Sequence, residues 1–162
     1  MERLRRKIDT VLVNWKNTPN HMPLIIKGAR QIGKTEAVRH FAFGHYKSVV
    51  EINFVLQKQY RDIFDDGFEV GTILKNISLR NPDFEFLPGE TLIFFDELQD
   101  CINCATSLKS FRLDGRYDVI CSGSLMGINY NEIESNSVGS KEDMEMYLSL
   151  IHISEPTRLL SI

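Results

Sequence analysis

Long apolar runs, a secretory leader and a strong charge of one sign are all missing from this 162-residue sequence. No apolar run approaches the roughly 20 residues that a membrane-spanning helix needs. The first residues contain no apolar segment of the kind found in a secretory signal. The net charge of −3 gives no general argument for binding to nucleic acid or to an anionic membrane. The composition, with 43% apolar and 25% charged residues, predicts a soluble globular protein with one domain.

Cysteine is also scarce, and its three copies do not form a recognisable zinc or redox motif. Cys101 and Cys104 have CxxC spacing, but no second pair of cysteines and no histidine pair completes a zinc set. A redox CxxC would be expected at the head of a thioredoxin-like helix, whereas this pair lies beside a different motif, described below. We therefore interpret the cysteines as incidental residues of a protein in the reducing cytosol.

One motif that is present organises the rest of the chain. Residues 28–35 read GARQIGKT, which is the G-x-x-x-x-G-K-T pattern of a phosphate-binding loop. We expect its backbone N–H groups to face one anion, Lys34 to contact the β- and γ-phosphates, and Thr35 to bind Mg²⁺. The predicted nucleotide-binding residues are Gly28, Ala29, Arg30, Gln31, Ile32, Gly33, Lys34 and Thr35.

The sequence on both sides of this motif favours phosphate binding over an ordinary glycine turn. A short apolar run at residues 23–27 predicts a buried strand before the loop. Residues 36–43 have apolar side chains at helical spacing, and Gly44 follows as a stop signal. A helix in this position directs its positive dipole end at the bound phosphates.

Further elements follow from the same kind of pattern. Apolar residues at three- and four-residue steps predict an amphipathic helix at residues 2–16, on which Arg3, Arg5, Arg6 and Lys7 form a basic cluster. We interpret the cluster as a solvated helix face, which leaves a nucleic-acid patch as the alternative. The remaining predictions are strands at 47–54, 91–95 and 117–122, two short helices within 57–80, a helix at 102–113, a mobile loop at 129–142 and a last strand starting near Met144.

The strand predicted at residues 91–95 ends in two carboxylates, Asp96 and Glu97. Ligands of open α/β sheets bind at the carboxyl ends of the strands. Asp96 could therefore hold Mg²⁺ opposite Thr35, and Glu97 could act as the general base that polarises the attacking water. The alternative is a helix N-terminus, where acidic residues are also favoured.

Two serines follow the next predicted strand. Ser122 or Ser124 could hydrogen-bond the γ-phosphate or the attacking water, the role called sensor 1, although an ordinary turn fits equally well. The strand predicted at 47–54, between the loop and the carboxylates, suggests the division of NTPases in which a glutamate activates water. The nearest match to a guanine-reading element, at residues 140–143, lacks the leading Asn, so adenine is favoured.

Taken together, residues 23–35, 91–99 and 115–125 resemble prokaryotic AAA-superfamily ATPases that carry an N-terminal ATPase domain and an uncharacterised C-terminal domain. The resemblance extends from about Trp15 to Tyr147. It implies an α/β P-loop NTPase sandwich with a parallel sheet of order 5-1-4-3-2, ATP and Mg²⁺ as cofactors, and a cytoplasmic location. It also places Lys34 and Thr35 in Walker A, Asp96 and Glu97 in Walker B, and Ser122 at or beside sensor 1.

The end of the chain departs from this family. Residues 148–162 look like the in-frame translation of a transposon-end sequencing adapter, so we expect a non-native tail after an incomplete ATPase domain at residues 1–147. Proteins of this type commonly take an arginine from a lid or a neighbouring subunit, which leaves other copies of the chain open as partners. Arg30, Arg112 and Arg116 are the local candidates, and the sequence selects none of them.

Three functions stay open at this level. The first is ATP hydrolysis coupled to a C-terminal domain. The second is a nucleotide-gated switch that binds a protein or DNA with little catalysis. The third is a small-molecule kinase, for which the sequence shows neither an arginine-bearing lid nor a substrate pocket.

Overall fold

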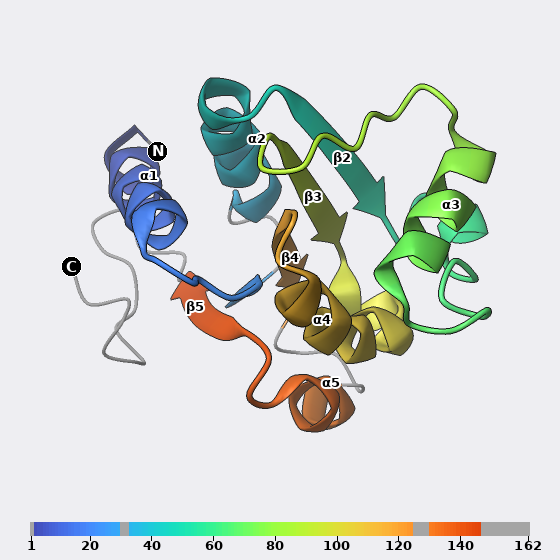
Figure 1. Cartoon of the computed structure of the whole chain (residues 1–162). Helices are drawn as coiled ribbons and strands as arrows, with labels where there is room; N and C mark the ends of the chain where they lie inside the picture. The colour runs from blue at the N-terminus through green and yellow to red at the C-terminus, as the bar shows by residue number, and fades with distance from the viewer. Residues whose placement is uncertain (1, 30–32, 125–129, 147–162) are drawn as a thin grey trace.

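In the computed structural model, which describes residues 2–29, 33–124 and 130–146, five parallel strands form one sheet flanked by helices (Figure 1). The strand order is β2-β3-β4-β1-β5, and every neighbouring pair is parallel. This confirms the predicted order 5-1-4-3-2, which is the same sheet read from the other edge. The strands are β1 Leu24–Gly28, β2 Ser48–Asn53, β3 Thr91–Asp96, β4 Asp118–Gly123 and β5 Glu142–Met146.

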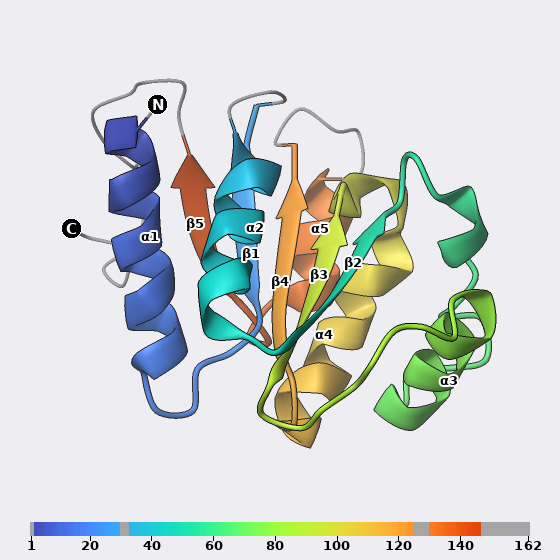
Figure 2. The same ribbon diagram turned by 90° about the horizontal axis from the view of Figure 1, so that it is seen from above.

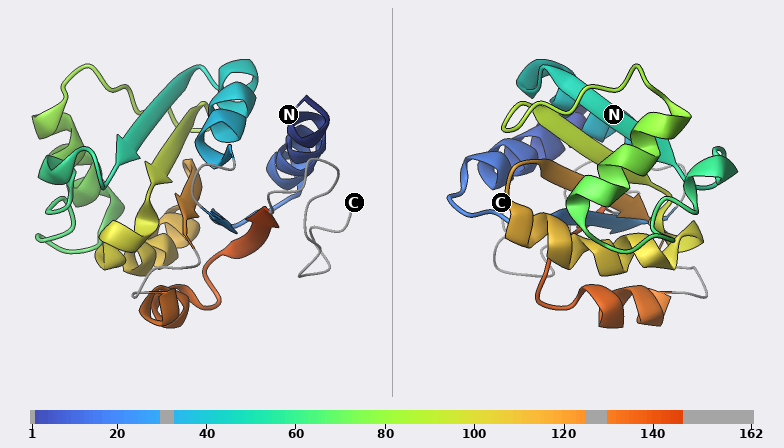
Figure 3. Two further views of the ribbon diagram at one scale, coloured as in Figure 1. Left: turned by 180° about the vertical axis from the view of Figure 1, so that it is seen from behind. Right: turned by 45° about the vertical axis from the view of Figure 1, so that its right-hand side comes forward.

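Helices cover both faces of this sheet. They are α1 Glu2–Asn17, α2 Lys34–His45, α3 Val70–Arg80, α4 Ile102–Asp114 and α5 Tyr130–Ser137, with short 3₁₀ turns at Lys58–Tyr60 and Leu98–Asp100. Figures 2 and 3 show α1 and α2 on one side of the sheet and α3, α4 and α5 on the other, which gives three layers. In the described ranges, no helix has both the length and the apolar character needed to cross a membrane.

The central strand β3 shows why the sheet lies inside the molecule. All six of its residues are buried, and its side chains alternate between two apolar clusters. Ile93 and Phe95 pack with α3 and α4, whereas Leu92 and Phe94 pack with α1 and α2. The near-continuous apolar sequence of β3 follows from this, because a strand covered on both faces has no solvent side.

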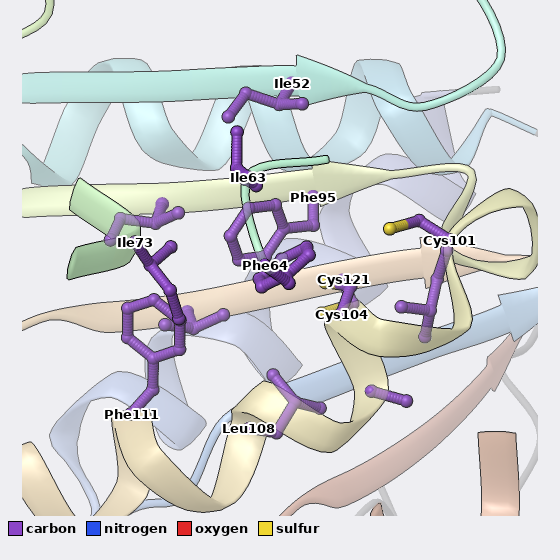
Figure 4. Close-up of a cluster of buried hydrophobic side chains, with 14 of the residues drawn as sticks. Ile52, Ile63, Phe64, Ile73, Phe95, Cys101, Cys104, Leu108, Phe111 and Cys121 are labelled. Carbon is purple, nitrogen blue, oxygen red and sulfur yellow. The ribbon is translucent and has the colours of Figure 1, made fainter. Parts of the chain in front are cut away.

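The three cysteines belong to the larger of these clusters (Figure 4). All three are free and buried. Burial raises the pKa of the Cys101 thiol to about 11 and holds that of Cys104 well above its usual range. Because the thiolate is the reactive form, these side chains act as apolar core residues.

The N-terminal helix has the predicted apolar face. Ile8, Val11, Leu12 and Trp15 are buried, and they contact residues of α2 and the sheet within the second apolar cluster. Of the basic cluster, only the side chain of Lys7 lies in the described part, where it is half-buried. The reading of this helix face as solvated therefore stays a prediction.

Two secondary-structure predictions were wrong. Residues 129–142 were expected to form a mobile loop, but Tyr130–Ser137 form the helix α5. The sequence of α5 is mostly polar, so its apolar spacing does not indicate a helix. Its Ile133 is buried in the larger cluster. Of the two helices predicted within residues 57–80, the second is α3, whereas the first is only the 3₁₀ turn Lys58–Tyr60.

Candidate functional site

Four neighbouring strands bring small or polar residues to one edge of the sheet. The strands point in the same direction, so their carboxyl ends meet at that edge (Figure 2). Asn53 at the end of β2 is directly paired with Asp96 at the end of β3. Ser122 near the end of β4 pairs with Ile26, two residues before Gly28 ends β1. The topology alone therefore gathers most of the residues singled out by the sequence.

The predicted phosphate loop connects β1 to α2 as expected. Gly33 directly precedes α2 with φ 92° and ψ 16°. An added Cβ at this position would meet no atom within 4 Å, so the backbone conformation, and not lack of space, favours glycine there. Arg30, Gln31 and Ile32 lie outside the described residues, and their phosphate-binding role stays a prediction.

Lys34, the first residue of α2, folds its side chain back over the loop. Its Nζ donates to the carbonyl oxygens of Gly28 at 3.0 Å and Ala29 at 2.7 Å. The side chain is mostly buried between the end of β1 and the start of α2. The ammonium therefore lies at the mouth of the loop, where a phosphate group would meet it.

The carboxylate of Asp96 accepts four hydrogen bonds from residues that the structure describes. Asp96 is 4% exposed. Oδ2 accepts from Thr35 Oγ1 at 2.8 Å and from Asn53 Nδ2 at 3.4 Å, while Oδ1 accepts from Ser122 Oγ and from the Glu97 backbone N–H at 3.0 Å. These donors come from α2, β2, β4 and the turn after β3, and together they fix the orientation of the carboxylate.

The pair Thr35 and Asp96 fits a magnesium site. Its ligands would be a hydroxyl and a carboxylate oxygen 2.8 Å apart, and Mg²⁺ prefers oxygen ligands. Mg²⁺ commonly uses one or two protein ligands and takes the others from phosphates and water. A cluster of three or more His, Cys, Asp or Glu side chains suited to a metal does not occur within the described ranges.

Glu97 follows Asp96 in an unusual backbone conformation. Its φ of 61° and ψ of 52° lie in the left-handed region, which is uncommon for a residue other than glycine. The side chain is half-buried, and its Oε1 accepts from Gln99 Nε2 at 2.8 Å. The strand β3 ends at Asp96, and the left-handed conformation of Glu97 begins the turn in which its carboxylate contacts Gln99.

The two predicted sensor serines both donate hydrogen bonds to other residues of the chain. Ser122 is 0% exposed and donates its hydroxyl to Asp96. The backbone N–H of Ser124 donates to Gln99 Oε1 at 3.2 Å. The structure therefore brings both serines to the carboxylate pair, Ser122 through Asp96 and Ser124 through Gln99.

Comparison with known families agrees with this geometry. Residues 20–150 match the family described as AAA domain. The chain belongs to the AAA domain family. No curated protein matches the chain.

Solved structures of two Drosophila chains show the same fold as this AAA domain at low sequence identity. A chain from Drosophila ORC bound to DNA is 10% identical with a TM-score of 0.54, covering 98% of this chain and 97% of that one. A chain from Drosophila ORC bound to GC-rich DNA and Cdc6 is 9% identical with a TM-score of 0.54, covering 98% and 60% respectively. The Aeropyrum pernix ORC1 protein in complex with DNA is 15% identical with a TM-score of 0.46, covering 88% and 44%. The AAA domain thus spans about half the length of two of these proteins.

A cluster of opposite charges lies behind the loop of the AAA domain. Lys27, one residue before Gly28, reaches Glu134 at 2.8 Å, Asp143 at 3.4 Å and Tyr130 Oη at 3.2 Å. Burial by itself would lower the pKa of Lys27, but the hydrogen bond to Glu134 and the charge of Asp143 outweigh burial and raise it. Lys27 is therefore charged. Its ion pairs connect β1 to α5 and β5, which is a structural role.

Two of the three candidate arginines lie away from the site. Arg112 is in the last turn of α4, and Arg116 pairs with Asp114 at 3.0 Å just before β4 begins. Both contact or flank the amino end of β4, the opposite edge of the sheet from Ser122. They therefore cannot reach the carboxylate pair of their own chain, and Arg30 lies outside the described residues.

Sequence reasoning missed Asn53 and Gln99. Asn53 is polar and ends a predicted strand, and this was the available signal, but its contact with Asp96 depends on the pairing of β2 with β3. Gln99 carries no sequence signal beyond its position two residues after Glu97. Its contact with Glu97 depends on the turn that follows the left-handed backbone of Glu97.

Proposed function

We propose that this AAA domain binds ATP with Mg²⁺ and hydrolyses the γ-phosphate bond. One observation carries the proposal: Asp96 accepts a hydrogen bond from the Thr35 hydroxyl at 2.8 Å, and Glu97 directly follows Asp96 at the end of β3. A metal ligand, a loop that can bind phosphate and a carboxylate able to accept a proton thus lie at one end of the sheet. Membership of the AAA domain family supports nucleotide binding by these residues.

The loop residues Gly28 to Thr35 would bind the phosphates through backbone N–H groups and the dipole of α2. Lys34 would exchange its bonds to the Gly28 and Ala29 carbonyls for the stronger attraction of a charged phosphate. Thr35 and Asp96 would hold Mg²⁺, which supplies positive charge to the phosphate oxygens when bound.

Glu97 would accept the proton of the attacking water. Ser122 was expected to contact the γ-phosphate or this water. Its hydroxyl is donated to Asp96 and is fully buried, so we assign it the role of orienting the metal-binding carboxylate. In the expected role the Ser122 hydroxyl would contact the γ-phosphate or the attacking water. In the role assigned here it donates to Asp96.

The test is phosphate release from radiolabelled ATP by the wild-type chain and by Glu97→Gln. Loss of the base predicts that hydrolysis falls by about a hundredfold or more, while the Kd for ATP stays within about twofold. Gln59→Glu, an exposed site elsewhere on the chain, is the control for altered charge. Equal hydrolysis by wild type and Glu97→Gln would remove Glu97 from the mechanism.

A second candidate is a nucleotide-gated switch that binds protein or DNA. The observation in its favour is the likeness in fold to ORC chains solved with DNA. Under this proposal the chain retains ATP tightly and releases no phosphate, and DNA or protein binding changes with the nucleotide.

The wider setting follows from the family resemblance. In the intact protein, we propose that ATP turnover drives a C-terminal domain in the cytoplasm, with other copies of the chain as partners. Residues 148–162 lie outside the described part of the chain, so their reading as a non-native tail stays a prediction. The genomic sequence after Tyr147 would test both the tail and the proposed C-terminal domain.

A further inference from the structure

Gln99 lies in the 3₁₀ turn after β3 and is 7% exposed. Its Nε2 donates to Glu97 Oε1 at 2.8 Å, and its Oε1 accepts from the Ser124 backbone N–H at 3.2 Å. A carboxylate can only accept and a backbone N–H can only donate, so these partners define which end of the amide is which. Gln99 therefore connects the carboxylate of Glu97 to the chain that leaves β4.

The amide of Gln99 is also confined by packing. A Cβ added to Gly123, the last residue of β4, would lie 3.1 Å from Gln99 Oε1 and 3.5 Å from Leu98 Cβ. A side chain at position 123 would thus press on the amide. The absence of a side chain at Gly123 leaves the space in which Gln99 reaches Ser124.

Glu97 needs such support because its backbone is strained. A non-glycine residue in the left-handed region costs of order 1–3 kcal/mol and persists only where its surroundings hold it. The Glu97 N–H is held by Asp96 Oδ1, and its side chain is held by Gln99. The first bond fixes the backbone, so the direction of the carboxylate depends on the second.

We propose that Gln99 is a positioning residue that holds the Glu97 carboxylate for the hydrolytic step and couples it to the end of β4. The inference rests on the proposed ATP hydrolysis. In this role Gln99 acts through Glu97 and not by contact with the nucleotide or the attacking water. Its removal should slow cleavage and leave ATP binding unchanged, because its partners Glu97 and Ser124 are not part of the phosphate-binding motif at residues 28–35.

The first experiment compares wild type with Gln99→Leu and Gln99→Glu in the full chain, with Gln59→Glu as the exposed control. Leu removes the hydrogen bonds to Glu97, Asp100 and Ser124, whereas Glu keeps the acceptor for Ser124 and places a second carboxylate against Glu97. We expect both variants to lower kcat about tenfold or more with the Kd for ATP within about twofold.

A double variant separates positioning from a general structural role. If Gln99 acts through Glu97, adding Gln99→Leu to Glu97→Gln should cost no further activity. Independent losses in the two backgrounds would overturn the inference. So would unchanged kcat in Gln99→Leu, or loss of ATP binding in step with kcat.

A second experiment decides the inference even if the chain does not hydrolyse ATP. The side-chain amide signals of Gln99 in ¹H–¹⁵N spectra can be assigned as those missing in Gln99→Leu. We expect these signals to move in Glu97→Ala and to stay in place in Gln59→Glu. Absent hydrolysis in wild type with a moving Gln99 signal would refute the proposed function alone, whereas an unmoved signal would refute the role of Gln99.

Discussion

At the scale of single residues, neighbouring groups hold Glu97 in a strained backbone conformation. Its left-handed backbone, with φ 61°, costs free energy that glycine would not lose. The conformation is kept by the bond from its N–H to Asp96 and by the contact with Gln99. Strain of this kind is found where the position of a functional group matters more than stability.

Substitution at Glu97 should reveal this strain. We expect Glu97→Gly to be more stable than Glu97→Ala by about 1 kcal/mol in urea unfolding, because only glycine adopts the left-handed region freely. Both variants should lack hydrolysis. Asn20, with φ 58°, is the matched control: Asn20→Gly should be more stable than Asn20→Ala and should retain hydrolysis. Equal stability of the two Glu97 variants would contradict the strain.

Ser122 tests the orientation of Asp96. Removing its hydroxyl in Ser122→Ala takes a donor from a buried carboxylate, so we expect a loss of about 1–3 kcal/mol in the free energy of unfolding. The Mg²⁺ concentration for half-maximal hydrolysis should rise several-fold, because Asp96 is less well fixed against Thr35. Ser107→Ala, also fully buried but bonded to Cys104 O in α4, should lose stability without a change in the Mg²⁺ requirement. A matching Mg²⁺ response in both variants would refute the role of Ser122.

At the scale of elements, the sequence predicted those features whose pattern lies within a few neighbouring residues. The apolar run of β3, the glycine motif before α2 and the carboxylates Asp96 and Glu97 were each readable within a few residues. Helix α5 was not, since it is attached through Glu134 to Lys27 of β1, far away in the sequence. The contacts of Asn53 and Gln99 were unreadable for the same reason, because strand pairing and a single strained turn create them.

The charge cluster that holds α5 should be sensitive to loss of one partner. Lys141 has a side chain only 5% exposed, bonded to Glu134 at 2.9 Å and Asp143 at 2.6 Å. Lys141→Met leaves these two carboxylates with Lys27 alone, so we expect the free energy of unfolding to fall by about 2–4 kcal/mol. Adding Glu134→Gln should recover part of this loss. Lys47→Met, at an exposed pair with Glu90, should cost less than about 1 kcal/mol in the same urea titration.

At the scale of the whole molecule, the two edges of the sheet have different roles. The carboxyl edge holds the candidate site, whereas the opposite edge holds a pocket of about 440 Å³ beside Trp15, His21 and Asp118. There the loop after α1 is joined to β4 and to the end of α2. His21 Nε2 lies 2.6 Å from Asp118 Oδ1, His21 Nδ1 lies 3.0 Å from Thr18 O, and Tyr46 donates to Asp118 Oδ2 at 2.6 Å. Because both ring nitrogens face acceptors, only the imidazolium form of His21 can donate to both.

This arrangement makes the stability of the chain depend on pH in a defined direction. The hydrogen bond to Asp118, opposed by burial, raises the pKa of His21 above its ordinary 6.5. Although burial favours the neutral form, the bonds from His21 and Tyr46 lower the pKa of Asp118. A raised histidine pKa stabilises the fold fully below the unfolded value and loses that effect as pH rises through the folded value. A lowered aspartate pKa stabilises above its unfolded value, and the effect is lost as pH falls through the folded one.

His21→Gln keeps a neutral donor and removes the charge, so the difference from wild type isolates the ion pair. We expect it to lower the free energy of unfolding by about 1–2 kcal/mol between roughly pH 5 and 6.5 and by less at pH 9. Urea titrations across this range measure the difference, with His40→Gln at the exposed pair with Asp9 as the control. That control should change by less than about 1 kcal/mol. A constant difference for His21→Gln from pH 5 to pH 9 would show that His21 is not held as a cation and that no ion pair joins the loop after α1 to β4.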